Sequence, residues 1–126
     1  MNVVAPDGQV LNKDVDFVLV RSVEGDLGIL AHHSPLIANL AIGVARYRED
    51  GMEGKIAVCG GFMEVADNKV TIIANTAETS EKINLERAEA AKDRAERRLK
   101  EKNSGTDLRR AEIALKRAIT RINARQ

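Results

Sequence analysis

The chain has 126 residues, of which 44% are hydrophobic and 31% charged, with a net charge of +1. This length suits one domain with an appendage, and no apolar run reaches the roughly 18 residues of a transmembrane helix. The first residues lack a signal-peptide pattern, so we expect a cytoplasmic protein. The single cysteine, Cys59, excludes an internal disulfide, and an aromatic content of 2% argues against a stacking platform for single-stranded nucleic acid.

The charge is unevenly distributed along the chain. Residues 1–80 hold 6 Lys and Arg and 11 Asp and Glu, a net charge of −5, whereas residues 81–126 hold 14 and 8, a net charge of +6. Eight of the nine glycines and both prolines also lie in the first part. We therefore expect two chemically different domains, residues 1–80 and residues 81–126.

The first part has the pattern of strands separated by turns. Residues 15–23 are apolar on both faces in the middle of a predicted strand, which indicates a central strand. Residues 24–28 are predicted to be a loop, because two glycines three apart rarely lie within a strand. The other predicted strands cover residues 2–5, 36–41, 44–48, 55–59, 62–65 and 70–74. Turn signals recur about every ten residues, which predicts an all-β sandwich or barrel and argues against a parallel α/β sheet.

Beyond residue 80 the apolar residues recur at the three- and four-residue spacing of helices. Residues 103–105 are expected to end a first helix, with Asn84 or residues 80–81 capping its start and Thr106 or Asp107 capping the second helix. Two helices of about 17 residues joined by a short turn should lie antiparallel. The predicted seam consists of Ala88, Ala91, Ala95 and Leu99 against Leu108, Ala111, Leu115, Ala118 and Ile122.

This predicted seam is rich in alanine. Alanine buries little apolar area, so at about 25 cal/mol per Å² the two helices stabilise each other weakly. We expect a marginal hairpin that can separate or dock elsewhere.

Arginines form a stripe on each predicted helix. Because a helix turns about 100° per residue, Arg87, Arg94 and Arg98 lie close together on the first helix. The second stripe consists of Arg110, Arg117 and Arg121. Two interpretations are open: solvated faces with ion pairs along each helix, or a site where several guanidinium groups hold a nucleotide or an acidic patch on a partner.

Several segments have a distinctive sequence: Glu24-Gly25-Asp26-Leu27-Gly28-Ile29-Leu30, His33-Ser34-Pro35-Leu36, residues 58–65 around Gly60-Gly61, residues 70–74 and residues 76–78. In this order they resemble the epsilon-subunit family of bacterial F-type ATP synthases. The helical hairpin continues the resemblance, which covers nearly the whole chain. The family implies a β + α fold: an N-terminal antiparallel β-sandwich of about ten strands, followed by a C-terminal antiparallel two-helix hairpin.

The resemblance implies a central-stalk rotor subunit that couples proton translocation to ATP synthesis. Its partners would be the gamma subunit, the c-ring and the alpha and beta subunits, at the cytoplasmic face of the bacterial cell membrane and attached to the membrane only through the complex. The hairpin would inhibit ATP hydrolysis when it extends and would lie against the sandwich when folded. The subunit itself is not expected to be an enzyme, because the sequence contains no catalytic constellation.

The resemblance also implies a regulatory ATP site in the folded hairpin, with no catalytic cofactor. The family motif Ile/Leu-Asp-x-x-Arg-Ala reads Ile83-Asn84-Leu85-Glu86-Arg87-Ala88, so Asn84 replaces the family aspartate. An amide oxygen still accepts hydrogen bonds, and the replacement removes one negative charge near the phosphates. The other implied nucleotide-binding residues are Glu78, Arg94, Arg117 and Arg121.

Asp26 and His33 match the family positions that face the polar loops of the c-ring; the alternative is an ordinary surface turn. No metal site is expected, because the adjacent side chains of His32 and His33 diverge and no other ligands surround them. The alternative function is a small β-barrel that binds nucleic acid through a basic helical tail. The acidic first part and the scarcity of aromatics argue against that alternative.

Overall fold

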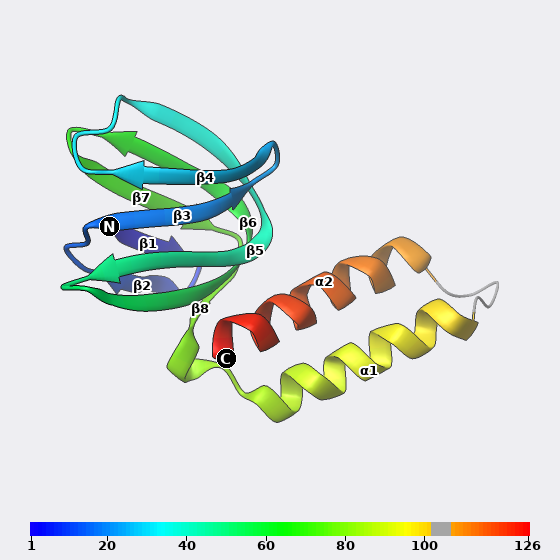
Figure 1. The fold of residues 1–126 in the computed structure, drawn as a ribbon. Coiled ribbons are helices and arrows are strands. Elements are labelled where there is room, and N and C mark those ends of the chain that lie inside the picture. Colours follow the sequence, from blue (N-terminus) through cyan, green and yellow to red (C-terminus); the bar gives the residue numbers. More distant parts are fainter. Residues whose placement is uncertain (102–106) are drawn as a thin grey trace.

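The computed structural model describes residues 1–101 and 107–126 of the chain. A curved sheet is followed by a short 3-10 helix and two α-helices that project to one side of it (Figure 1). The strands are β1 (Asn2–Ala5), β2 (Gly8–Asn12), β3 (Phe17–Ser22), β4 (Gly25–Leu30), β5 (Leu36–Glu49), β6 (Met52–Ala66), β7 (Lys69–Ala74) and β8 (Ala77–Thr79). The helices are η1 (Ser80–Lys82), α1 (Leu85–Glu101) and α2 (Leu108–Arg125).

The sheet folds over itself to form the predicted β-sandwich. Its strand order is β2-β1-β7-β6-β5-β3-β4, with β8 paired to β6. The two ends of this order face each other, because Val3 of β1 and Ile72 of β7 share one buried cluster with Val18 of β3 and Ile29 of β4. All pairs are antiparallel except β1 with β7, which the sequence did not predict.

The described residues hold eight strands, roughly the number that the resemblance implies, and two predicted strand pairs are each one long strand. Strand β5 continues through Gly43, and β6 continues through Gly60 and Gly61. Gly60 and Gly61 have positive φ, 79° and 120°. A Cβ on Gly61 would collide with the carbonyl oxygen of Ile73, so glycine allows β6 to bend there without losing its partner β7.

The predicted loop at residues 24–28 is wrong, because β4 spans Gly25–Leu30 and pairs with β3. Gly25 has φ of 127° and lies at the tight turn between these strands. A Cβ on Gly28 would lie 3.2 Å from the ring of Phe17, so this second glycine makes room for an aromatic side chain across the strand pair. Strand β2 also went unpredicted.

Each helix begins at a polar residue that the sequence had identified. The Asn84 side-chain oxygen accepts a hydrogen bond from the Arg87 backbone N–H at 3.1 Å, and Asp107 accepts one from Arg110 at 3.1 Å. Both are typical N-caps. The predicted stop at residues 103–105 and the alternative cap Thr106 lie outside the described residues.

The hairpin seam is formed by small residues, as predicted. Ala88 and Ala95 of α1 and Ala111 and Ala118 of α2 are all buried. Leu108, assigned to this seam from its spacing, is instead 40% exposed. It is the first residue of α2.

A second face of α2 attaches the hairpin to the sandwich. Helix α2 contacts β5, β6 and η1, whereas α1 packs chiefly against α2. Ala124 packs with Ala57 of β6, Ile83 and the partly buried Val44 of β5. Thr120 is also buried, one turn before Ala124. This attachment therefore buries mostly small side chains. None of the described helices contains an apolar stretch of membrane-spanning length.

Candidate functional site

A groove of about 430 Å³ lies in the crease where the chain passes from the sandwich into α1. It is lined by residues from β8, η1 and both helices: Glu78, Lys82, Asn84, Arg87, Ala88, Ala90, Ala91, Arg94 and Arg121. The volume falls within the range of small-molecule sites, about 300–1,000 Å³.

The groove is strongly cationic. Among the described residues that line it, four side chains carry positive charge and only Glu78 carries negative charge. Arg87 and Arg94 are two turns apart on α1, so they share one face of that helix. Guanidinium groups held in this way can bind phosphate or carboxylate oxygens in pairs. The arrangement therefore suits a ligand with several negative charges.

Glu78 and Arg121 join the sandwich to the hairpin across this groove. The Arg121 Nε donates to the Glu78 Oε1 at 2.7 Å, and the two side chains are 32% and 38% exposed. Among the ion pairs of the described residues, this pair alone links the two domains. An anion that drew Arg121 toward itself would therefore act directly on the contact that helps to position α2.

Asn84 connects helix formation with the groove. Its side-chain oxygen already accepts the N-cap hydrogen bond from Arg87, and the residue also lines the cavity. Its amide nitrogen can donate to a ligand oxygen, whereas an aspartate at this position could only accept. Compared with an aspartate, Asn84 therefore adds a hydrogen-bond donor to this wall of the groove and still caps α1.

The structure brings most, but not all, of the predicted nucleotide-binding residues together. Glu78, Asn84, Arg87, Ala88, Arg94 and Arg121 all line the groove. Ile83 does not line it: this residue is 4% exposed and packs beneath α2 against Ala57 and Ala124. Arg117 does not line it either, although it lies one turn from Arg121. Ile83 and Arg117 can therefore affect the groove only by positioning the neighbouring residues that line it.

Sequence reasoning missed Lys82, Ala90 and Ala91 as groove residues. Lys82 lies in η1, and no periodic pattern identified that short helix. Ala91 had been assigned to the seam; its helical position lies between the seam and the arginine stripe, so it serves as the floor of the groove. The stripe itself was the signal that could have identified Ala90 and Ala91 as its neighbours.

Asp26 and His33 lie near opposite ends of strand β4. Asp26 lies near the start of β4 and forms an ion pair with Arg21 of β3 at 3.2 Å. His33 follows the other end of β4, and its Nδ1 lies 2.7 Å from the Ser34 carbonyl oxygen. The structure therefore places the two residues at opposite ends of one strand and does not bring them together.

Within residues 1–101 and 107–126, no group of three or more His, Cys, Asp or Glu side chains is arranged to hold a metal ion. Cys59 is buried on β6, where it acts as a small apolar residue.

Comparisons with known proteins cover the whole chain. Residues 1–80 match the beta-sandwich domain of the ATP synthase delta/epsilon chain, and residues 81–126 match its long alpha-helix domain. The ATP synthase epsilon chain of Desulfitobacterium hafniense strain Y51 is 54% identical over 124 residues, which cover 98% of this chain and 93% of that one. The corresponding chain of Bacillus velezensis is 51% identical over 123 residues, with the same coverage of 98% and 93%.

Solved structures agree with these sequence relatives. A chain in the OSCP/F1/c-ring structure of Euglena gracilis mitochondrial ATP synthase superimposes with a TM-score of 0.78 and 26% identity, covering 91% of this chain and 73% of that chain. A chain from the central stalk and c-ring of the Tetrahymena thermophila mitochondrial enzyme has the same fold, with a TM-score of 0.56 and 15% identity over 97% of this chain and 89% of that one.

Proposed function

This chain belongs to the ATP synthase delta/epsilon chain family, and from that premise we propose that it is the central-stalk epsilon subunit of a bacterial F-type ATP synthase. In this role it couples proton translocation to ATP synthesis by binding to the rotor, and it does no chemistry itself. It lies at the cytoplasmic face of the cell membrane and is attached to the membrane only through the complex. Since the family match extends over both domains, it takes precedence over the nucleic-acid-binding alternative.

The attachment of the hairpin is the observation that carries the regulatory part of this proposal. Helix α2 docks on the sandwich through Thr120 and Ala124, and the packed residues around Ala124 are Val44, Ala57 and Ile83. Small side chains bury little apolar area, so this contact is weak enough to break. We therefore infer that the hairpin leaves the sandwich, extends toward the alpha and beta subunits and inhibits ATP hydrolysis.

The cationic groove supports ATP as a regulatory ligand of the folded hairpin. The triphosphate would lie among Arg87, Arg94 and Arg121, with Lys82 at the η1 end. A ligand that contacts β8, α1 and α2 together can bind only while the hairpin is folded. Such a ligand stabilises the folded state by mass action and opposes the inhibitory state.

An exposed apolar patch supports the gamma subunit as a partner of the sandwich. Phe62 of β6 lies directly opposite Ile73 of β7 and diagonally opposite Ile37 of β5, and these side chains are 40%, 45% and 73% exposed. Apolar side chains gathered in this way on a sheet face mark a protein interface. We assign this patch, Ile37, Phe62 and Ile73, to the gamma subunit.

The turn between β3 and β4 supports contact with the c-ring. Glu24 lies in this turn, and Asp26 at the start of β4 is paired with Arg21, so the three side chains together carry a net negative charge, which suits a polar or cationic loop of the ring. His33 can take part in the same contact only if the ring surface extends along the whole of β4.

The proposal is tested by measuring ATP hydrolysis of the F1 complex assembled with either the full chain or residues 1–80. We expect faster hydrolysis with residues 1–80 at low ATP, because the inhibitory hairpin is missing. At millimolar ATP the two complexes should differ less, because the nucleotide holds the hairpin folded. Equal rates at every ATP concentration would contradict the regulatory role.

A further inference from the structure

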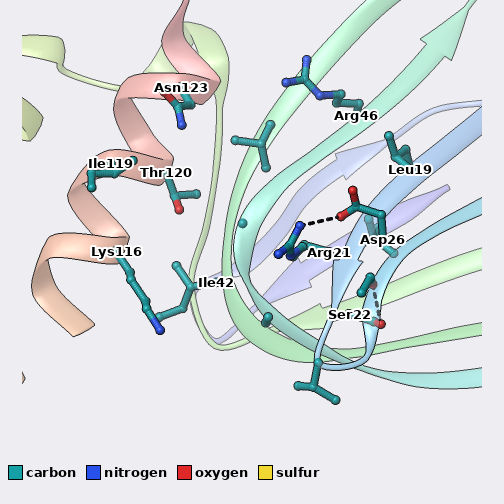
Figure 2. A pocket seen from close by; sticks show the side chains of 16 residues that line it. Leu19, Arg21, Ser22, Asp26, Ile42, Arg46, Lys116, Ile119, Thr120 and Asn123 are labelled. Atoms are coloured by element: carbon teal, nitrogen blue, oxygen red, sulfur yellow. Dashed lines mark hydrogen bonds and ion pairs between the residues drawn. The ribbon is translucent and has the colours of Figure 1, made fainter. Parts of the chain in front are cut away.

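A second, larger groove of about 620 Å³ lies on another side of α2, between this helix and strands β3 and β5 (Figure 2). None of its lining residues lines the groove at Glu78 and Arg94. The helix wall consists of Lys116, Ile119, Thr120 and Asn123.

The groove exists because β3 and β5 separate there. They pair at Leu19 with Arg46 and again at Ser22 with Leu40, so two residues of β3 span the same distance as five residues of β5. The extra residues make β5 bulge below α2. Gly43 is required within this bulge, because a Cβ there would lie 2.7 Å from the Cβ of Arg21.

Cations from both walls surround the groove. Arg21 and Arg46 come from the sheet and Lys116 comes from the helix, while Asp26 is the only carboxylate among the described residues that line it. Figure 2 shows Lys116 reaching from α2 toward Ile42 of β5. Among the described residues Lys116 forms no ion pair.

The two arginines form exposed ion pairs within the sandwich. Arg21 contacts Asp26 at 3.2 Å and Arg46 contacts Glu53 at 2.8 Å, and all four side chains are at least 41% exposed. Exposed pairs of this kind contribute little to stability, so a partner's carboxylate can replace the present one at little cost. Both guanidinium groups are thus available to another carboxylate.

The rim of the groove is apolar on both walls. Val23 on the sheet side is 64% exposed, and Ile119 on α2 is 38% exposed. Large apolar side chains beside cations favour a partner that carries carboxylates together with apolar groups. A free inorganic anion would use the cations but would leave Val23 and Ile119 exposed to water.

We propose that this groove binds an acidic amphipathic segment of a partner protein. Its carboxylates contact Lys116, Arg21 and Arg46, and its apolar side chains cover Val23 and Ile119. Because the walls belong to the sandwich and to α2, the segment binds only the folded hairpin and holds it down. That regulatory consequence rests on the hairpin movement proposed above, whereas the binding itself does not.

The probe is a fluorescent amphipathic peptide of about 14 residues with leucines on one helical face and glutamates beside them. Its binding to the full chain is followed by fluorescence anisotropy. We expect Lys116→Glu to weaken binding at least about tenfold, since a carboxylate then faces carboxylates across the groove. The matched control is Lys100→Glu on α1, which lies outside this groove and should change the affinity less than about twofold.

A second measurement locates the peptide. Amide hydrogen exchange in α2 and in residues 41–45 should slow when the peptide binds, and a peptide with lysines in place of the glutamates should have no such effect. Equal affinity of Lys116→Glu and the unmodified chain would overturn the proposal, as would protection confined to the patch of Ile37, Phe62 and Ile73. If the F1 hydrolysis test fails, the inhibitory role of the hairpin is refuted, but the outcome of this peptide-binding test is unaffected.

Discussion

Arg94 and Arg117 show that the position of an arginine in the folded hairpin decides whether it can contribute to the cationic groove. Both lie on stripes that the sequence had placed at one anion site, yet Arg94 lines the cationic groove and Arg117 does not. A lost charge-assisted hydrogen bond costs about 1.5–3 kcal/mol, and every 1.4 kcal/mol is a tenfold change in affinity.

We therefore predict that Arg94→Ala weakens ATP binding by about tenfold or more, while Arg117→Ala changes it by about twofold or less. Isothermal titration of the full chain with ATP measures both affinities. Arg97→Ala, on the same helix but outside the groove, controls for the loss of one positive charge. A greater loss from Arg117→Ala than from Arg94→Ala would show that the nucleotide lies elsewhere on the hairpin.

At the scale of the secondary-structure element, the bend of β6 depends on the backbone conformation of Gly61 and on its contact with β7. Gly61 has a positive φ of 120° and lies against the backbone of Ile73, whereas Gly8 has a φ of 127° with open space around it. The two glycines thus share a backbone conformation that disfavours other residues, and only Gly61 adds a close contact.

Replacing each of these glycines by alanine separates the two effects. We expect Gly8→Ala to lower the free energy of unfolding by about 1–3 kcal/mol through backbone strain. Gly61→Ala should cost more, because its Cβ would also push β7 away from β6. Urea unfolding followed by circular dichroism measures the difference. Similar losses in both variants would mean that β7 moves aside without cost.

Strands and helices differ in how well the sequence predicted them. Helix α2 was predicted well because its apolar residues repeat regularly and Asp107 marks its start. Strands β5 and β6 were each divided in two, because a glycine inside a strand has the same local signature as a turn. Whether Gly43 or Gly61 ends a strand depends on the neighbouring strand, which is distant in the sequence.

At the scale of the whole molecule, one small interface joins the two domains. Ala124 is 0% exposed and packs between the hairpin and Ala57 of the sandwich. We predict that Ala124→Glu releases the hairpin, because an unpaired buried charge costs about 3–5 kcal/mol. The sandwich has its own core and should remain folded.

Small-angle scattering and backbone NMR measure this release. The radius of gyration should rise in Ala124→Glu, and chemical shifts around Val44 and Ala57 should change while those of β1 and β7 stay. Arg125→Glu, at the exposed neighbouring position, is the control and should leave the hairpin docked. A compact Ala124→Glu protein would mean that the Glu78–Arg121 pair and the remaining contacts suffice to hold α2.

The sequence by itself predicted two helices, with Asn84 and Asp107 among their candidate starts, and the alanine seam, because each depends on residues close together in the chain. It also placed the arginines on stripes, since helical spacing fixes their angles. Only the tertiary structure decided which arginines meet at one groove. That choice follows from where α2 packs on the sandwich: the contact of Ala124 with Ala57 and Val44 accompanies Arg121 beside Glu78, and Arg117 lies one turn farther along the helix. No local pattern contains that contact.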